Sequence, residues 1–262
     1  MRKFFLFLLA ISAIAVCEAK SKKTTVTTEN RKTAAFKCIS MSGPIDVIYT
    51  QGKTCSVKVT SPAEQMKDVK TGVKDGTLFI SYEGQNCISF TANGIGNLFR
   101  AIGGRSSGYE GITVYVTSPD IIEINLTGSG DFVSRNRIDT DKLTLRLRGS
   151  GDMTISDIIC DEIDTELVGS GDIRLPRTDV LRSRISLVGS GDIGIGQSNT
   201  RHTEISLKGS GDINVSFAGD KCGTANASLY GSGDITLSGR LKSLKKTSRG
   251  SGDFHTGKLT EK

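Results

Sequence analysis

The residues best placed to do chemistry in this sequence are seven aspartates that recur in one short motif. Gly-Ser-Gly-Asp begins at residues 128, 149, 169, 189, 209, 231 and 250, so successive copies stand about 20 residues apart. The aspartates are Asp131, Asp152, Asp172, Asp192, Asp212, Asp234 and Asp253. A carboxylate beside a serine hydroxyl can act as a general base, ligate a cation or accept hydrogen bonds. Catalysis requires one differentiated constellation, so sevenfold repetition favours the last two roles.

Calcium is the cation to consider for such a column. Calcium-binding solenoids repeat GGxGxDxUx, whereas here the aspartate directly follows the second glycine and each copy has only one such turn. Seven stacked carboxylates would repel each other by a sum comparable with the stability of a whole domain. We expect hydrogen bonds from glycine N–H groups and serine hydroxyls to offset this repulsion. A row of calcium ions on the seven aspartates and direct ligand binding are the alternatives.

Other catalytic signals are weak, and we predict a protein that is not an enzyme and has no cofactor. The G-x-S-x-G nucleophile motif is absent around these serines. His202 and His255 are the only histidines, and we interpret both as exposed polar residues. A polysaccharide-cleaving enzyme is therefore the least favoured alternative, and no catalytic residue is predicted.

Apolar residues alternate around each motif and predict strands. In the copy LVGSGDI, Leu187 and Ile193 occupy positions that are apolar in nearly every repeat. Period 2 then places Gly189 and Gly191 inward and the intervening serine and the aspartate outward. Glycine is required there either because the coil is narrow or because the chain turns with a positive φ. The sequence leaves both explanations open.

A repeat of about 20 residues predicts a solenoid. We expect an all-β protein in which residues 119–262 form a right-handed parallel β-helix, with two or three short strands in each coil. Lys246 and Ser248 replace apolar residues in the last copy. They predict a polar cap at the C-terminal end of the stack.

Residues 34–118 predict an N-terminal β region that packs as a continuation of the solenoid. The short extended runs indicate a meander of about five strands, with a hairpin at Asp75-Gly76. Residues 84–111 interrupt them as a long glycine-rich loop. Residues 20–33 are polar and aperiodic, and we expect a flexible leader there.

Residues 1–19 predict a secretory signal peptide. Arg2 and Lys3 precede an apolar run over residues 4–16 that is too short for a membrane anchor. Lipidation at Cys17 is the alternative. No later apolar stretch is long enough for a transmembrane helix, so we expect an exported protein of the periplasm, cell surface or outer membrane.

Removal of residues 1–19 would leave five cysteines, an odd number for an exported chain. Cys55 and Cys87 are the most plausible disulfide pair. Cys160 and Cys222 stand about three repeats apart, and we interpret them as small buried hydrophobic residues.

A stiff solenoid offers long faces on which similar groups recur, which suits an extended partner such as a glycan or another surface polymer. Candidate contacts are Arg146, Arg148, Lys208 and Tyr230 in outward columns, and Phe99, Arg100, Arg105 and Tyr109 in the loop. A purely structural envelope protein is the alternative. The net charge of +6 is spread along the chain without a basic block, so nucleic-acid binding is not expected. The oligomeric state is left open.

The repeated GSGD, the preceding alternation, the stretch Ser42-Gly43-Pro44-Ile45-Asp46-Val47 and the segment Lys74-Asp75-Gly76-Thr77-Leu78 together resemble one bacterial family. The chain is similar, over about residues 36–254, to the DUF2807 family, "putative auto-transporter adhesin, head GIN domain". This resemblance implies an exported β-solenoid of Gram-negative bacteria with no established enzymatic activity. It implies no catalytic or binding residues. The 84–111 loop is longer than the usual family connection.

Overall fold

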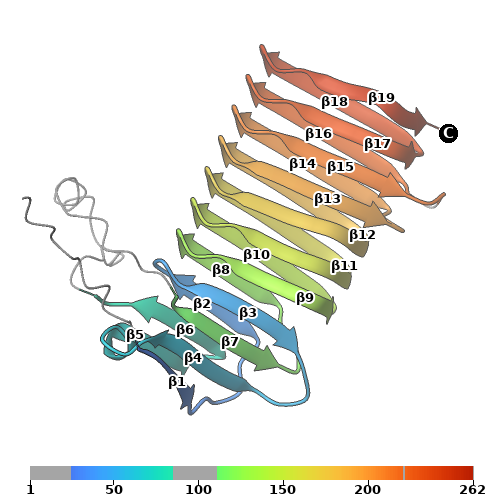
Figure 1. Ribbon diagram of the computed structural model, residues 1–262. Coiled ribbons are helices and arrows are strands. Elements are labelled where there is room, and N and C mark those ends of the chain that lie inside the picture. The colour runs from blue at the N-terminus through green and yellow to red at the C-terminus, as the bar shows by residue number, and fades with distance from the viewer. Residues whose placement is uncertain (1–24, 85–110, 221, 262) are drawn as a thin grey trace, which may run out of the picture.

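The chain folds as a parallel β-solenoid of about seven turns (Figure 1). This computed structural model describes residues 25–84, 111–220 and 222–261. The predicted signal peptide with Cys17, the loop candidates Phe99, Arg100, Arg105 and Tyr109, and Cys87 lie outside the described residues. The described residues contain no helix that could span a membrane.

The strands form two parallel stacks, which we call stack A and stack B. In spatial order, stack A contains β6 (Thr77–Tyr82), β2 (Cys38–Ser42), β8 (Glu123–Gly128), β10 (Lys142–Gly149), the C-terminal halves of β11 (Met153–Gly169) and β12 (Asp172–Gly189), β14 (His202–Gly209), β16 (Thr224–Gly231) and β18 (Ser243–Gly250). Stack B contains β7 (Thr113–Ser118), β3 (Asp46–Gln51), β9 (Phe132–Asp139), the N-terminal halves of β11 and β12, β13 (Asp192–Ser198), β15 (Ile213–Ala218), β17 (Ile235–Leu241) and β19 (Phe254–Glu261).

Each GSGD motif joins a strand of stack A to the next strand of stack B, and the seven motifs line one edge of the solenoid, at the left in Figure 1. The register pairs each first glycine with its counterpart one coil away, as in Gly189 with Gly209. A coil therefore has two long strands. The opposite turn is so tight in two coils that β11 and β12 run through it without interruption.

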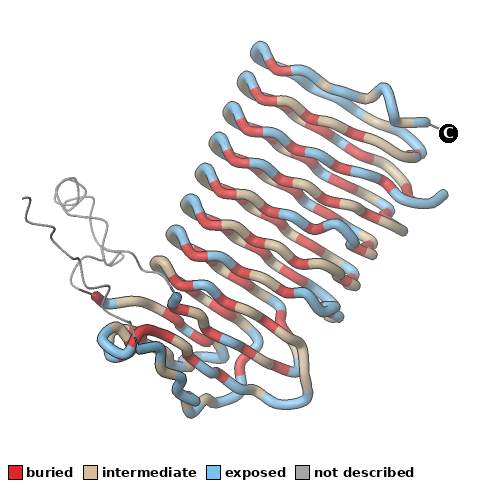
Figure 2. Tube along the Cα trace, viewed as in Figure 1, coloured by how far each residue is buried: buried red, intermediate tan, exposed pale blue. Residues whose placement is uncertain are grey.

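One continuous hydrophobic core lies between the stacks. Leu187 and Ile193 are fully buried, which confirms the alternation predicted around the motif. Figure 2 shows buried and exposed residues alternating along the strands, and a last coil that is mostly exposed. In β18, Lys246 and Ser248 are exposed, so the terminal coil is the polar cap that the sequence predicted.

The N-terminal region continues the two stacks, as expected, but it is not a simple meander. β2 and β3 each lie parallel to their neighbours on both sides. The antiparallel pairs are at the periphery, where β4 (Ser56–Pro62) pairs with β7, and β5 (Val69–Lys74) pairs with β6. Asp75 and Gly76 both have positive φ, 50° and 74°, which confirms the hairpin. The meander was wrong because order along the chain does not fix which strands become neighbours.

The expected flexible leader is also partly wrong, because Val26–Arg31 forms β1. This strand pairs antiparallel with β4 in a register that joins Val26 to Pro62. The β-branched residues of β1 favour an extended chain, and the open edge of β4 supplies the partner. A single turn of 3-10 helix, Met66–Asp68, follows β4.

Candidate functional site

The two glycines of GSGD are required for different reasons. Gly189 has a φ of 138°, and a Cβ on it would lie 2.1 Å from the carbonyl oxygen of Gly169. Gly191 has an ordinary φ, but its Cβ would lie 1.9 Å from the carbonyl oxygen of Gly171. The first glycine therefore needs both its conformation and its space, whereas the second needs only the space.

The aspartates form a hydrogen-bonded ladder, although with a different donor from the one expected. Oδ1 of Asp192 accepts the backbone N–H of Asp212 at 3.0 Å. The same bond links every consecutive pair from Asp46 to Asp253, at 2.9 to 3.2 Å. The N–H groups of Ser190 and Gly191 instead donate to the carbonyl of Gly169. Each carboxylate thus ties its own coil to the next.

The ladder begins one coil earlier than the sequence motif shows. Asp46 occupies the aspartate position of a degenerate copy, Gly43-Pro44-Ile45-Asp46. Gly43 retains a positive φ of 96°, as the first glycine of the motif requires. The copy was missed because Pro44 and Ile45 replace the serine and the second glycine. Its detectable signal was the retained spacing of glycine, aspartate and the following valine.

Cationic side chains accompany parts of this column. Arg174 contacts Asp172 at 2.5 Å and Asp152 at 3.9 Å. His255 lies 3.0 Å from Asp234. The N–H of Asp253 and then the His255 hydrogen bond lower the pKa of Asp234, while the bond to Asp234 raises the pKa of His255.

The column therefore acts in the structure as a link between coils. Among the described residues, no three His, Cys, Asp or Glu side chains are grouped so that they could hold a metal ion. Calcium binding by the seven aspartates stays an alternative prediction.

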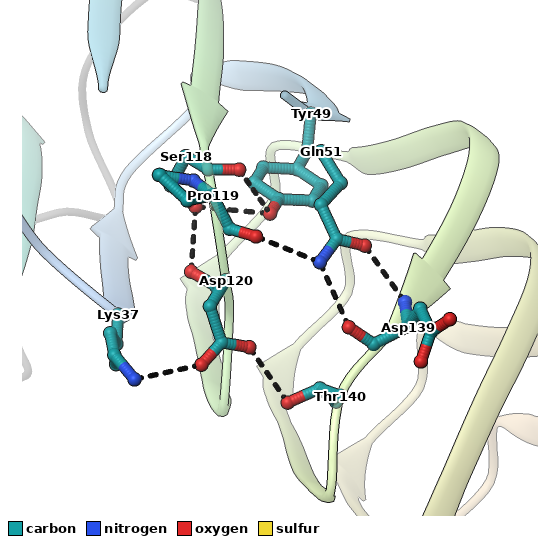
Figure 3. Close-up of polar contacts among 8 residues, drawn as sticks. All are labelled: Lys37, Tyr49, Gln51, Ser118, Pro119, Asp120, Asp139 and Thr140. Carbon is teal, nitrogen blue, oxygen red and sulfur yellow. Dashed lines mark hydrogen bonds and ion pairs between the residues drawn. The ribbon is translucent and has the colours of Figure 1, made fainter. Parts of the chain in front are cut away.

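A second polar cluster lies at the opposite edge, near the N-terminal coils (Figure 3). The amide nitrogen of Gln51 donates to the carbonyls of Pro119 and Asp139, at 3.0 and 2.8 Å, while its oxygen accepts the N–H of Asp139 at 2.8 Å. The side chain of Gln51 therefore makes the hydrogen bonds that a backbone partner would otherwise make where β3, β7 and β9 end. Its role is structural.

The same cluster contains Tyr49 and Asp120. Burial raises the pKa of Tyr49 to about 12, and its hydroxyl lies 3.0 Å from that of Ser118. Burial also acts to raise the pKa of Asp120, but hydrogen bonds from Lys37 and Thr140 outweigh it and leave that pKa below its ordinary value. The side chains of Lys37, Tyr49 and Asp120 each have a hydrogen-bond partner within the cluster, and Lys37 and Asp120 also line a pocket of about 390 Å³.

The outward side chains of stack A include the predicted contacts. Arg146 contacts Glu123 at 2.6 Å and Glu166 at 3.5 Å. Arg148 also pairs with Glu166, at 3.5 Å. These two candidates are therefore engaged in ion pairs between coils. Lys208 and Tyr230 lie together in another part of the face, because they are paired neighbours in β14 and β16.

A groove of about 460 Å³ crosses four coils on the outer face of stack A. We call it the serine groove. Its floor is a column of outward hydroxyl side chains. One side is formed by the outward residues that stand two positions earlier in each strand. These residues are Ser186, Ser206, Ser228 and Thr247 on the floor, and Arg184, Glu204, Asn226 and Lys245 on the side.

The outward column beyond the floor contains Val188, Lys208, Tyr230 and Arg249. Val188 and Tyr230 are exposed apolar side chains. The serine groove thus runs along the solenoid axis beside Lys208 and Tyr230, two of the residues predicted as contacts. The sequence did not single out the serines because they belong to a column that carries charged residues in other coils.

The outer face of stack B has a larger hollow, of about 660 Å³, with Gly194 and Gly196 among its lining residues. A Cβ on Gly196 would lie 2.3 Å from the carbonyl oxygen of Pro176, so packing requires that glycine. A Cβ on Gly194 would have nothing within 4 Å. The fold therefore does not explain why residue 194 is glycine.

The remaining candidates have ordinary surroundings. Nδ1 of His202 lies 2.9 Å from the hydroxyl of Thr224, and Nε2 lies 3.7 Å from Glu204. Cys160 and Cys222 are buried, which confirms their interpretation as small core residues. Burial raises the pKa of Cys160 to about 12. Cys55 is a free thiol in the structure, and because Cys87 lies outside the described residues, their pairing stays a prediction.

The fold and sequence are similar to those of known proteins. A putative adhesin from Bacteroides fragilis NCTC 9343 has 21% identity and a TM-score of 0.74, with 88% of this chain and 96% of that chain covered. A putative adhesin from Parabacteroides distasonis ATCC 8503 has 19% identity and a TM-score of 0.63, covering 89% and 97%. A putative lipid binding protein from the same strain has 18% identity and a TM-score of 0.61, covering 92% and 98%.

No curated protein matches the chain. The family described as "Putative auto-transporter adhesin, head GIN domain" matches residues 35–240, most of the described chain. This match agrees with the motif-based resemblance and ends just before the last coil. The chain therefore belongs to the DUF2807 family.

Proposed function

We propose that this protein is an exported, non-enzymatic adhesin that binds an extended surface polymer, a glycan chain, along the serine groove. The observation that carries the proposal is the groove itself, which keeps the same hydroxyl column open across four coils. An extended polymer can lie along such a column and meet similar groups in each coil. The adhesin-like family and the similar solved structures support this class of function.

The chemistry of the groove suits a polyhydroxylated chain. Parallel strands are spaced by about 4.8 Å, so successive floor hydroxyls recur at about that interval. Serine and threonine hydroxyls both donate and accept hydrogen bonds, as sugar hydroxyls do. Tyr230, which is 38% exposed, adds an aromatic surface beside the floor.

The other parts of the proposal rest on the sequence and the family. The apolar run at residues 4–16 supports export, and the adhesin-like family supports a periplasmic or cell-surface location. Cys17 is the position for a lipid anchor if the signal is of the lipoprotein type. Absence of a catalytic role is supported by the repeated motif, whose aspartates bond to backbone N–H groups rather than forming one differentiated site.

The test uses a panel of soluble polysaccharides and the full chain after signal removal. Ser206→Tyr places a large side chain on the groove floor, where the outward position tolerates an aromatic residue without disturbing the core. Thr236→Tyr is the matched control, because Thr236 faces outward in β17 of stack B.

We expect at least one polysaccharide to bind the unmodified protein, with Ser206→Tyr weakening binding at least tenfold and Thr236→Tyr leaving it within twofold. Binding to no polymer would favour a purely structural envelope protein. Loss of binding in Thr236→Tyr alone would move the site to stack B.

A further inference from the structure

The charged side chains on the outer face of stack A are balanced over most of its length. From β8 to the start of β14, five basic and five acidic residues occupy the outward columns. They are Lys142, Arg146, Arg148, Arg182 and Arg184, and Glu123, Glu162, Asp164, Glu166 and Glu204. The charges of these side chains alternate in sign from one coil to the next, so that ion pairs form between coils. An example is Arg184 with Glu204, at 3.1 Å.

This balance ends beyond Glu204. The remaining outward charges of stack A are Lys208, Lys245 and Arg249, and no acidic residue follows Glu204 in the outward columns of β14, β16 and β18. All three cations are exposed, and within the described part of the chain none has an ion-pair partner. The aspartates of the turns lie around the edge and are engaged in the ladder.

Protection of an open sheet edge explains only part of this excess. Lysines on an edge strand discourage pairing with other chains, and β18 is such a strand. Lys246 fits that role, because its ammonium lies 5.8 Å from the centre of the Phe254 ring at the exposed end of the core. Lys208 does not fit it, because β14 is paired on both sides, with β12 and β16.

The three unpaired cations surround one end of the serine groove. Lys245 lines it, and Lys208 and Arg249 stand in the column on the other side of the floor hydroxyls. Lys208 and Arg249 are two coils apart, which corresponds to about 10 Å at the spacing of parallel strands. A polymer in the groove would therefore have cations on both of its flanks.

We infer that the ligand of the serine groove is an anionic polysaccharide, one that carries carboxylate groups along its chain. This inference rests on the proposed function and narrows it to one chemical class. The unpaired cations would neutralise the carboxylates, and the floor hydroxyls would bond the sugar hydroxyls. A single-stranded nucleic acid fits less well, because no aromatic residue lines the groove and, in the flanking column, Tyr230 alone offers a ring on which a base could stack.

The experiment compares two forms of one polymer, polygalacturonate and its methyl ester, which differ in the charge of the carboxyl groups. Binding to the full chain is measured by calorimetry at low and at moderate salt. The variant K208Q/K245Q/R249Q removes the cations of the groove. The matched control K53Q/K70Q/K74Q removes the same charge from exposed lysines near the N-terminal strands.

We expect polygalacturonate to bind at least tenfold more tightly than the ester, and salt to weaken its binding. The groove variant should lose about tenfold in affinity for polygalacturonate, as three modest ion pairs imply, and the control should stay within twofold. Equal losses in both variants would overturn the inference, because they would show a response to net charge alone.

Two further results would also overturn it. One is equal binding of polygalacturonate and single-stranded poly-dT, which would indicate a general preference for polyanions. The other is failure of polygalacturonate to bind while neutral polymers bind in a way that Ser206→Tyr abolishes. In that case the proposed function would stand and only the anionic class would be wrong. If no polymer, neutral or anionic, binds, both proposals fail.

Discussion

Replacing the second glycine of one motif should separate two coils of the solenoid. In Gly191→Ala the new Cβ would lie 1.9 Å from the carbonyl oxygen of Gly171, about 1 Å closer than real Cβ contacts allow. The obstacle is backbone, so the coils must move apart. Three hydrogen bonds cross this gap: Ser190 and Gly191 donate to Gly169, and Asp192 donates to Asp172.

The expected cost follows from these contacts. Each hydrogen bond contributes about 0.5–1.5 kcal/mol net, and overpacking typically costs about 1–3 kcal/mol. We expect Gly191→Ala to lower the free energy of unfolding by about 3–5 kcal/mol. Gly194→Ala is the internal control, since its Cβ would have nothing within 4 Å. Removing an unneeded strand glycine should stabilise the protein by up to about 1 kcal/mol.

Urea unfolding followed by far-UV circular dichroism measures both variants. A reduced slope for Gly191→Ala would indicate that the coils on either side unfold separately, as repeat proteins can. A free energy of unfolding for Gly191→Ala within about 0.5 kcal/mol of that of the unmodified protein, or equal destabilisation of the two alanine variants, would show that the close stacking of the coils does not require this glycine.

Four further predictions concern the polar groups and one buried thiol. Because its bond to Asp234 raises the pKa of His255, the histidine should titrate above 6.5 by NMR. In Asp234→Asn its pKa should return toward that value. The stabilisation from this pair should be present below pH 6.5 and be lost as the pH rises through the raised pKa. Asp234 has a lowered pKa, so its contribution should be lost only as the pH falls below its ordinary value of 3.8; a titration of Asp234 at or above that value would contradict this. Gln51→Leu should lower the free energy of unfolding by about 1–3 kcal/mol and accelerate amide hydrogen exchange at Asp139, whose N–H loses its partner. Unchanged exchange would show that the Gln51 side chain does not hold this N–H. Cys160 is buried and has a pKa raised to about 12, so it should react with a thiol reagent only in denaturant.

Repetition made the stacking direction predictable from the sequence. Seven aligned copies predict parallel coils, because only stacking can bury the aligned leucine and isoleucine columns together. The degenerate copy ending in Asp46 was not recognised, because Pro44 and Ile45 break the motif and the bond from the N–H of Asp131 to Asp46 is a long-range contact. The partner of β1 was likewise undetectable, since an exposed strand has no buried face to reveal its period.

The functional surface was predictable only in part. Lys208 and Tyr230 were identified as outward, and they do flank the serine groove. Arg146 and Arg148 are outward too, but Glu123 and Glu166 in the neighbouring coils neutralise them. The sequence also did not reveal that the backbone N–H of the next aspartate donates to each carboxylate, because this depends on the spacing between neighbouring coils.

The most direct test of the proposed function is a map of backbone amide chemical shifts of the full chain during titration with a polysaccharide that binds. If the polymer lies in the serine groove, the shifts will concentrate in β14, β16 and β18, at Ser206, Ser228, Thr247 and their neighbours on stack A. Shifts confined to stack B, or to the aspartates of the turns, would show that the serine groove is not the binding site.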